Sequence, residues 1–305
     1  MLLRQAYGKG DNLMYRKKID LFDIFNILFM IMVMIITLYP LVHVMMSSFS
    51  EPLLYIKHRG ILLWPTGFSL LSYQLAFENK MILISYANTI FYVTAGTAIN
   101  LILTFFGAFV LSRRDLYFKN YIMFFIAVTM LFNGGLIPNY MVVRNLDLIN
   151  KVWAMLLPEA INPFNLILMK TYMDTIPGEL EESAKIDGAN ECKILFNVIL
   201  PLCKPIIAVM VLFYGVGHWN EWFLAAMYIR DRKLYPLQLV LRELLVSNST
   251  TSMAGAGSSG LSDLHSISAT LKNAIIIISI VPVLMIYPFV QKYFTKGVML
   301  GAIKG

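Results

Sequence analysis

The side chains that could do chemistry fall into two groups. An acidic stretch places Glu179, Glu181 and Glu182 together, and a polar stretch at 218–222 interrupts a long apolar run. Carboxylates in the first turn of a helix are favoured by the helix dipole, so the first group is typical of a charged docking helix. The second group offers hydrogen-bonding groups within a segment apolar enough to lie in lipid. The two groups therefore indicate docking and solute contact rather than bond breaking.

Patterns typical of enzymes and nucleotide sites are missing from the sequence. It contains no HExxH zinc motif and no GxxxxGK[ST] phosphate loop, so any ATP hydrolysis must come from another polypeptide. Gly255–Gly260 formally fits GxGxxG, but it follows no expected strand and opens no expected helix. Cys192 and Cys203 have no histidine near them in the sequence, and we interpret both as packing residues rather than metal ligands.

Composition places the chain in a membrane. Of its 305 residues 58% are apolar and only 14% charged, and the mean hydropathy is +0.67. Soluble domains carry about 25% charge, so this balance predicts a polytopic membrane protein. The net charge of +7 is explained by basic residues retained on the cytoplasmic side. No soluble segment combines a basic stripe with aromatic residues, which argues against nucleic acid as a partner.

Hydropathy predicts an all-α membrane protein with six spans. The charge distribution supports a cytoplasmic N-terminus, because fifteen of the 25 Lys and Arg residues then lie inside. This orientation makes both termini cytoplasmic and places 174–204 inside as a coupling loop and 230–272 outside. Residues 1–19 form a cytoplasmic segment, and 20–305 form the six-span domain. The expected spans are about 24–48, 82–112, 120–140, 152–173, 205–229 and 273–292.

Local signals define the ends of the acidic helix. Pro177 and Gly178 end the preceding span and allow a turn, after which the three glutamates start a new helix. Gly188 lacks a Cβ and ends or bends that helix. A similar break is expected at Asn133-Gly134-Gly135, because Gly-Gly followed by Pro138 opposes continuation of a helix.

The acidic loop resembles a known family signature. Glu182-Ser183-Ala184, Gly188 and the later Leu200-Pro201 look like the EAA motif of the integral membrane subunits of bacterial ABC importers, although Ser183 replaces the first alanine. His218-Trp219-Asn220-Glu221-Trp222-Phe223 and the ending Gly301–Gly305 resemble the same family, and the closest resemblance is to maltose-type permeases. Gly134–Pro138 resembles subunits that handle larger or acidic saccharides.

The resemblance implies a type I ABC importer permease in the bacterial cytoplasmic membrane, surrounded by lipid. A homologous second permease would complete a heterodimer, two cytoplasmic ABC ATPases would bind ATP and Mg, and an extracellular solute-binding protein would deliver an oligosaccharide. This chain would hold no cofactor of its own. The acidic helix would enter a groove of the ATPase, with Glu182 paired to a basic residue there. Ser183 and Ala184 belong to the same coupling motif, and Asp187 and Gly188 would shape the turn.

The fifth span supplies most candidates for the substrate path. Tyr214, His218 and Trp222 recur at i, i+4 and i+8, so a continuous helix would place them on one face. Asn220 and Glu221 are polar at membrane depth, and Glu159 in the fourth span is a further candidate. Packing is the competing interpretation: Trp219 and Trp222 suit an interfacial aromatic belt, and Asn220 suits a helix cap.

Three other functions remain open at this point. The same fold could import a non-sugar solute such as a peptide or an anion. A polytopic membrane enzyme would need catalytic groups that the sequence does not show. A membrane scaffold that merely holds an ATPase would not need polar residues within its spans.

We predict that Gly188→Asp or Glu182→Lys abolishes uptake and leaves the protein in the membrane, because each change disrupts docking of the ATPase. Uptake of labelled sugar and immunoblots of isolated membranes measure the two effects. Sugar-stimulated ATP hydrolysis at the parental level in the purified mutant complex would contradict this prediction.

Overall fold

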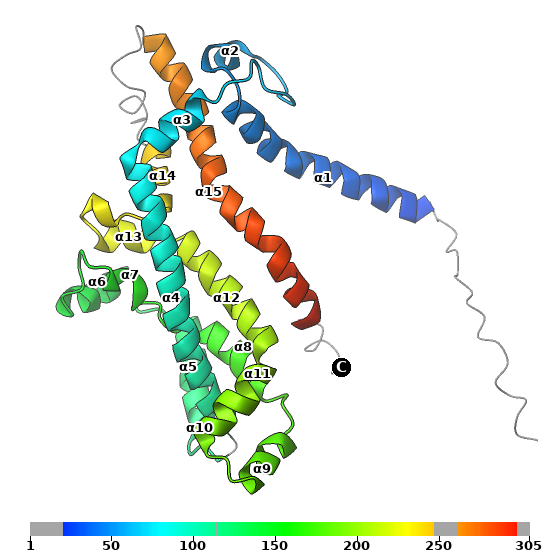
Figure 1. Cartoon of the computed structure of the whole chain (residues 1–305), viewed down its shortest axis with the longest axis vertical. Coiled ribbons are helices and arrows are strands. Elements are labelled where there is room, and N and C mark those ends of the chain that lie inside the picture. The colour runs from blue at the N-terminus through cyan, green and yellow to red at the C-terminus, as the bar shows by residue number, and fades with distance from the viewer. Residues whose placement is uncertain (1–20, 114, 247–260, 298–305) are drawn as a thin grey trace, which may run out of the picture.

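A computed structural model of the chain describes residues 21–113, 115–246 and 261–297 (Figure 1). Helices dominate these residues, and the only strand-like pairing among them is an isolated bridge between Ser50 and Phe68. The expected all-α class is confirmed. The N-terminal segment 1–19, the glycine-rich stretch Gly255–Gly260 and the ending Gly301–Gly305 lie outside the described residues.

The described residues form a series of helices. In chain order they are α1 Leu21–Ser48, α2 Pro52–Lys57, α3 Leu71–Glu78, α4 Lys80–Ser112, α5 Lys119–Leu131, α6 Leu136–Asn145, α7 Trp153–Leu156, α8 Pro163–Met173, α9 Glu179–Ile186, α10 Glu191–Ile194, the π-helical η1 Leu195–Ile199, α11 Leu200–Leu202, α12 Lys204–Trp219, α13 Phe223–Tyr228, the 3-10 helix η2 Arg232–Leu234, α14 Leu237–Val246 and α15 Leu261–Gly297.

Three of the described helices are long and apolar enough to cross a bilayer without a break, namely α1, α4 and the stretch 267–286 of α15. If each of two sharply bent pairs counts as one crossing, the number rises to five. Helix α1 extends away from the other helices (Figure 1), and the most apolar 18-residue window of this helix has no buried residue. Such a helix is stable only when lipid or another chain covers it.

The expected break after the third span is confirmed. Helix α5 ends at Leu131, and α6 starts at Leu136 with its axis turned by 114°. Gly135 has φ +88°, and its N–H donates to Oδ1 of Asn133 at 2.9 Å. A positive φ favours glycine, which explains the turn. The helix expected at 120–140 is therefore interrupted, and residues 136–140 belong to α6.

Two further expected spans are each divided between two helices. The stretch 152–173 consists of α7, an irregular segment 157–162 and the 11-residue α8. The stretch 205–229 is divided at Asn220 between α12 and α13. The prolines explain the first break, because Pro163 fits the first turn of α8 but could not continue a helix from before it.

Helix α4 is the centre of the fold, since α12, α8, α7, α14 and η2 all pack against it. The contact with α12 is close where Gly96 faces His218, because the imidazole occupies the space that a Cβ at position 96 would need. One buried cluster joins α4, α8 and α12 near the acidic helix, and another joins α4, α7 and α13 toward the other end. Helix α4 thus connects the two ends of the molecule.

We predict that Gly96→Ala lowers the stability of the permease by about 1–3 kcal/mol, because the added methyl overpacks the α4–α12 contact and displaces His218. Gly217→Ala is the matched control, since no atom lies within 4 Å of its Cβ position. Thermal unfolding of the purified variants measures the effect. Equal unfolding temperatures for the two variants would show that the contact is not tight.

Candidate functional site

The acidic helix α9 has the ends that the sequence predicted. It starts at Glu179 after Gly178, and Asp187 occupies its C-cap position. Gly188 follows with φ +76°, and nothing lies within 4 Å of where its Cβ would be. Its backbone conformation, rather than crowding, therefore requires glycine at position 188.

The predicted coupling residues divide by exposure. Glu182, Ser183, Asp187 and Gly188 are exposed, whereas Ala184 is half-buried against the cluster shared by α4, α8 and α12. Ile186 on the same helix is 86% exposed, which is unusual for an isoleucine in a charged segment. The sequence analysis missed Ile186, although a lone large apolar residue between charged ones was a signal for a contact surface.

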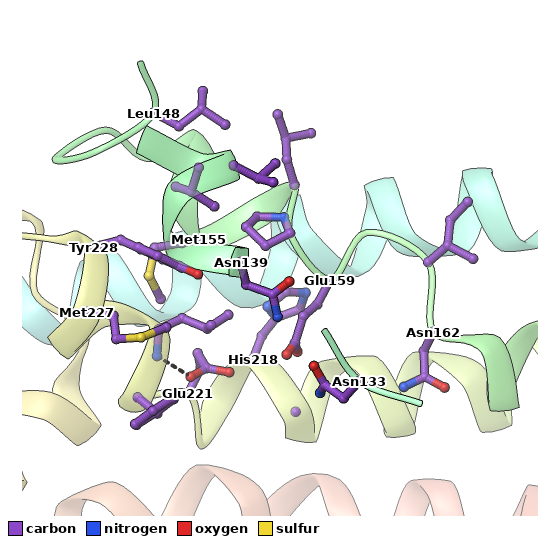
Figure 2. A pocket seen from close by; sticks show the side chains of 18 of the residues that line it. Asn133, Asn139, Leu148, Met155, Glu159, Asn162, His218, Glu221, Met227 and Tyr228 are labelled. Atoms are coloured by element: carbon purple, nitrogen blue, oxygen red, sulfur yellow. Dashed lines mark hydrogen bonds between the residues drawn. The ribbon is translucent and has the colours of Figure 1, made fainter. Parts of the chain in front are cut away.

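A cavity of about 830 Å³ lies between α6, the segment 157–162, α12 and α13. Figure 2 shows that the side chains of Glu159, His218, Glu221 and Asn139 come together there from separate elements. No lysine or arginine occurs among the residues that line the described cavity. The polar lining residues are Asn133, Asn139, Glu159, Asn162, Asn165, Tyr214, His218, Glu221 and Tyr228.

Four of the seven candidate path residues line this cavity: Tyr214, His218, Glu221 and Glu159. Glu221 follows the end of α12, and its Oε1 accepts a hydrogen bond from the backbone N–H of Leu224 at 2.9 Å. This bond fixes the carboxylate at the start of α13. The remaining oxygen can accept further hydrogen bonds.

The other three candidates do not line the described cavity, and each has a packing role. Trp219 is buried, and its Nε1–H donates to the carbonyl of Ser279 at 3.1 Å. Asn220 caps α12 and donates to the carbonyl of Val216 at 3.0 Å. The Trp222 ring stacks with Arg242, whose guanidinium carbon lies 3.8 Å from the centre of the ring.

The expectation that Trp222 shares a helical face with Tyr214 and His218 is wrong. Helix α12 ends at Trp219, so the i, i+4, i+8 spacing does not extend to residue 222. No proline occurs at this point, and only the asparagine at position 220 signalled the end of the helix.

Asn100 in the middle of α4 binds two walls of the cavity, the segment 157–162 and His218. The sequence analysis missed this residue. Its amide donates to the carbonyls of Glu159 at 2.9 Å and Ala160 at 2.8 Å. Its Oδ1 is therefore left to accept from His218 Nε2, 2.7 Å away. Because Nε2 must carry the proton, Nδ1 of the neutral ring remains an acceptor. An amide within an apolar stretch was the signal in the sequence for such a role, and the structure buries this amide fully.

Tyr214 supports the same segment from α12. Its hydroxyl lies 2.7 Å from Oγ1 of Thr104 and accepts a hydrogen bond of 3.4 Å from the backbone N–H of Asn162. The irregular segment 157–162 is thus bound to both α4 and α12. Non-helical backbone at membrane depth is tolerated where protein or a cavity surrounds it, and this segment has both.

We predict that Asn100→Leu destabilises the permease by about 3 kcal/mol or more, because two carbonyls and the His218 N–H lose their partner. Asn139→Leu, at a cavity-lining amide, is the control and is expected to cost less than about 0.5 kcal/mol. Denaturant unfolding of the purified variants gives both values. Comparable losses would show that Asn100 does not hold the segment.

Comparison with known proteins identifies the family. The model of the binding-protein-dependent transport system inner membrane component matches residues 104–300. The chain is 41% identical to the polygalacturonan/rhamnogalacturonan transport system permease protein YtcP of Bacillus subtilis (strain 168), over 93% of this chain and 99% of that one. It is 40% identical to Protein LplC of the same organism, over 93% and 95% of the two chains.

A solved structure shows the same fold. A chain in the crystal structure of a bacterial ABC transporter that imports the acidic polysaccharide alginate superposes with a TM-score of 0.83 at 32% identity, covering 92% of this chain and 99% of that one. The fold, the EAA-like helix and the family match agree. The chain belongs to the family of binding-protein-dependent transport system inner membrane components, and it is a multi-pass permease subunit of an ABC importer rather than an enzyme.

Proposed function

We propose that this chain is the membrane subunit through which an ABC importer takes up oligosaccharides, and that the cavity between α6, α12 and α13 is its half of the path. The observation that carries the proposal is the cavity itself, which gathers polar side chains from several elements of an otherwise apolar chain. Polar groups in a membrane protein are costly unless they face water, a solute or one another.

The lining groups suit sugar hydroxyls, which both donate and accept hydrogen bonds. Glu159 and Glu221 accept hydrogen bonds, and the amides of Asn133 and Asn139 both donate and accept them. Relatives that transport saccharides support the same solute class, among them the arabinooligosaccharides transport system permease protein AraQ of Halalkalibacterium halodurans, 24% identical over 88% of this chain.

The proposal includes the other subunits of the importer. A homologous second permease completes the path, two ATPases on the cytoplasmic side bind ATP and Mg, and an extracellular solute-binding protein delivers the saccharide. Both termini then lie in the cytoplasm, as the distribution of Lys and Arg indicates. No cofactor is assigned to this chain.

Helix α9 is the docking element for the ATPase in this proposal. Its exposed carboxylate at Glu182 and its exposed Ile186 suit a groove with a basic residue and an apolar pocket. Ser183 is small and exposed, so it lets the helix approach the ATPase closely, whereas Ala184 packs against the core cluster of this chain. Asp187 and Gly188 set the turn that follows. Movement of the ATPases would reach the membrane helices through this contact.

The substrate is tested on the receptor first. The cognate solute-binding protein is heated with maltotriose, xylotriose, arabinotriose or trigalacturonate, and a rise in its unfolding temperature identifies the sugar. The same labelled sugar is then taken up by cells that express the complex. Stabilisation by a peptide or a simple anion, with no response to any saccharide, would overturn the proposal.

We predict that Glu221→Gln raises the KM for uptake about tenfold, because a neutral amide accepts a weaker hydrogen bond than a carboxylate. The amide oxygen can still accept from the Leu224 N–H, so the local fold is kept. Asn220→Ala next to it does not touch the cavity and is expected to leave the KM unchanged. An unchanged KM in Glu221→Gln would exclude this carboxylate from the path.

A further inference from the structure

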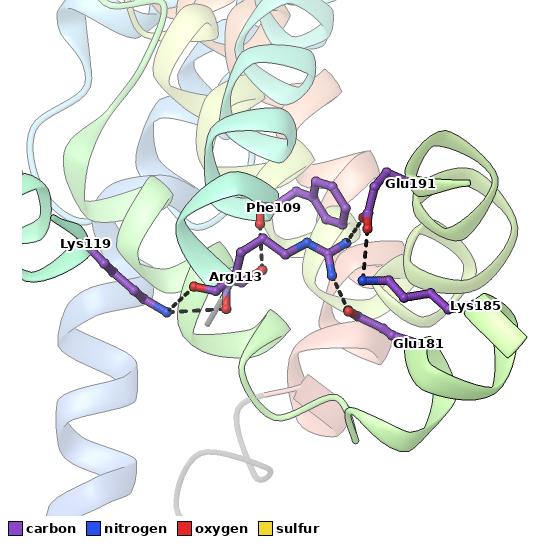
Figure 3. Close-up of polar contacts among 7 residues, drawn as sticks. Phe109, Arg113, Lys119, Glu181, Lys185 and Glu191 are labelled. Carbon is purple, nitrogen blue, oxygen red and sulfur yellow. Dashed lines mark hydrogen bonds and ion pairs between the residues drawn. The ribbon is translucent and has the colours of Figure 1, made fainter. Parts of the chain in front are cut away.

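One guanidinium joins the acidic helix to the end of α4. Arg113 follows the last residue of α4 and forms ion pairs with Glu181 on α9 and, at 3.1 Å, with Glu191 on α10 (Figure 3). Lys185 on α9 lies 3.0 Å from the other oxygen of Glu191. Two cations and two carboxylates from three helices thus form one network.

Contacts with α4 also hold the Arg113 guanidinium in place. It lies 3.9 Å from the centre of the Phe109 ring, and the Arg113 side chain is only 17% exposed. Lys119 donates to the carbonyls of Ser112 at 3.3 Å and Arg113 at 3.1 Å, which satisfies the end of α4. The pair of Arg113 with Glu181, whose side chain is 26% exposed, is therefore stronger than an ion pair on an open surface.

Helix α9 has few other anchors. None of its residues is buried, and only Ala184 among them packs against the nearby core cluster. The orientation of α9 relative to the membrane helices therefore depends largely on the charges at Arg113. Glu182 is different from Glu181, because it is exposed and has no ion-pair partner among the described residues.

The other end of the connection reaches the cavity. From Arg113, α4 runs back to Asn100, about 20 Å away at 1.5 Å per residue. Asn100 binds His218 and the segment 157–162, and Gly96 lies against His218 one turn further on. A displacement of α9 would thus be transmitted along a single helix to the cavity wall.

We propose that Arg113 is a positioning residue, which ties α9 to α4 so that the motion of a docked ATPase reaches the cavity. Glu181 and Glu191 serve this internal contact, and Glu182 is left for the ATPase. The proposal does not depend on which sugar is transported, but it rests on the proposed docking of the ATPase at α9.

The test measures the affinity of the purified ATPase subunit for the permease pair in nanodiscs. Arg113→Glu repels both glutamates, so α9 loses its orientation and the Kd rises about tenfold. Arg113→Lys keeps the positive charge but loses the planar set of N–H donors that can bind two carboxylates at once. We expect this variant to raise the Kd about threefold. The charge-reversed pair Arg113→Glu with Glu181→Arg restores the ion pair and returns the Kd to within about threefold of the parent.

Two controls separate positioning from general damage. Lys170→Gln removes a lysine that is 16% exposed and pairs at 2.5 Å with Asp174 within α8 alone, so the affinity is expected to stay at the parental value. Glu179→Arg combined with Arg113→Glu reverses an exposed carboxylate of α9 that forms no ion pair among the described residues, and it is expected to give no recovery. The proposal is overturned if the charge-reversed pair binds no better than Arg113→Glu, or if Lys170→Gln weakens binding as much as Arg113→Glu.

Discussion

The fold depends on hydrogen bonds to the backbone of an irregular segment, because lipid offers no hydrogen-bond partners at that depth. Residues 157–162 interrupt a span, and their free carbonyls and N–H groups need partners inside the protein. Asn100 supplies two donors and the Tyr214 hydroxyl supplies one acceptor. These bonds fix the segment against α4 and α12, and the interruption becomes one wall of a cavity.

The same bonds determine the chemistry of that cavity. Because Asn100 uses both amide hydrogens on the segment, its oxygen orients His218, and Gly96 provides the space for the ring. The cavity combines this oriented imidazole with carboxylates and amides and has no cation among its described lining residues. A solute rich in hydroxyl groups finds donors and acceptors there.

Helix α4 relates this cavity to the acidic helix. Its middle carries Asn100 and Gly96, and its end carries the Arg113 network that holds α9. The exposed face of α9 keeps Glu182 and Ile186 available for another protein. In the proposed function, this arrangement would connect an ATPase docked at α9 with the cavity.

The sequence by itself determined the membrane character, the helical class, both ends of α9 and the break at Asn133–Gly135. Composition and local signals such as proline, glycine and first-turn carboxylates act within a few residues and need no distant partner. Tertiary structure alone decided that Asn100 binds a segment 60 positions away and that Arg113 pairs with Glu181 rather than with solvent. These outcomes depend on which helices meet. Hydropathy assigns an amide or a charge to a depth in the membrane, but it does not identify the group on another helix that satisfies it.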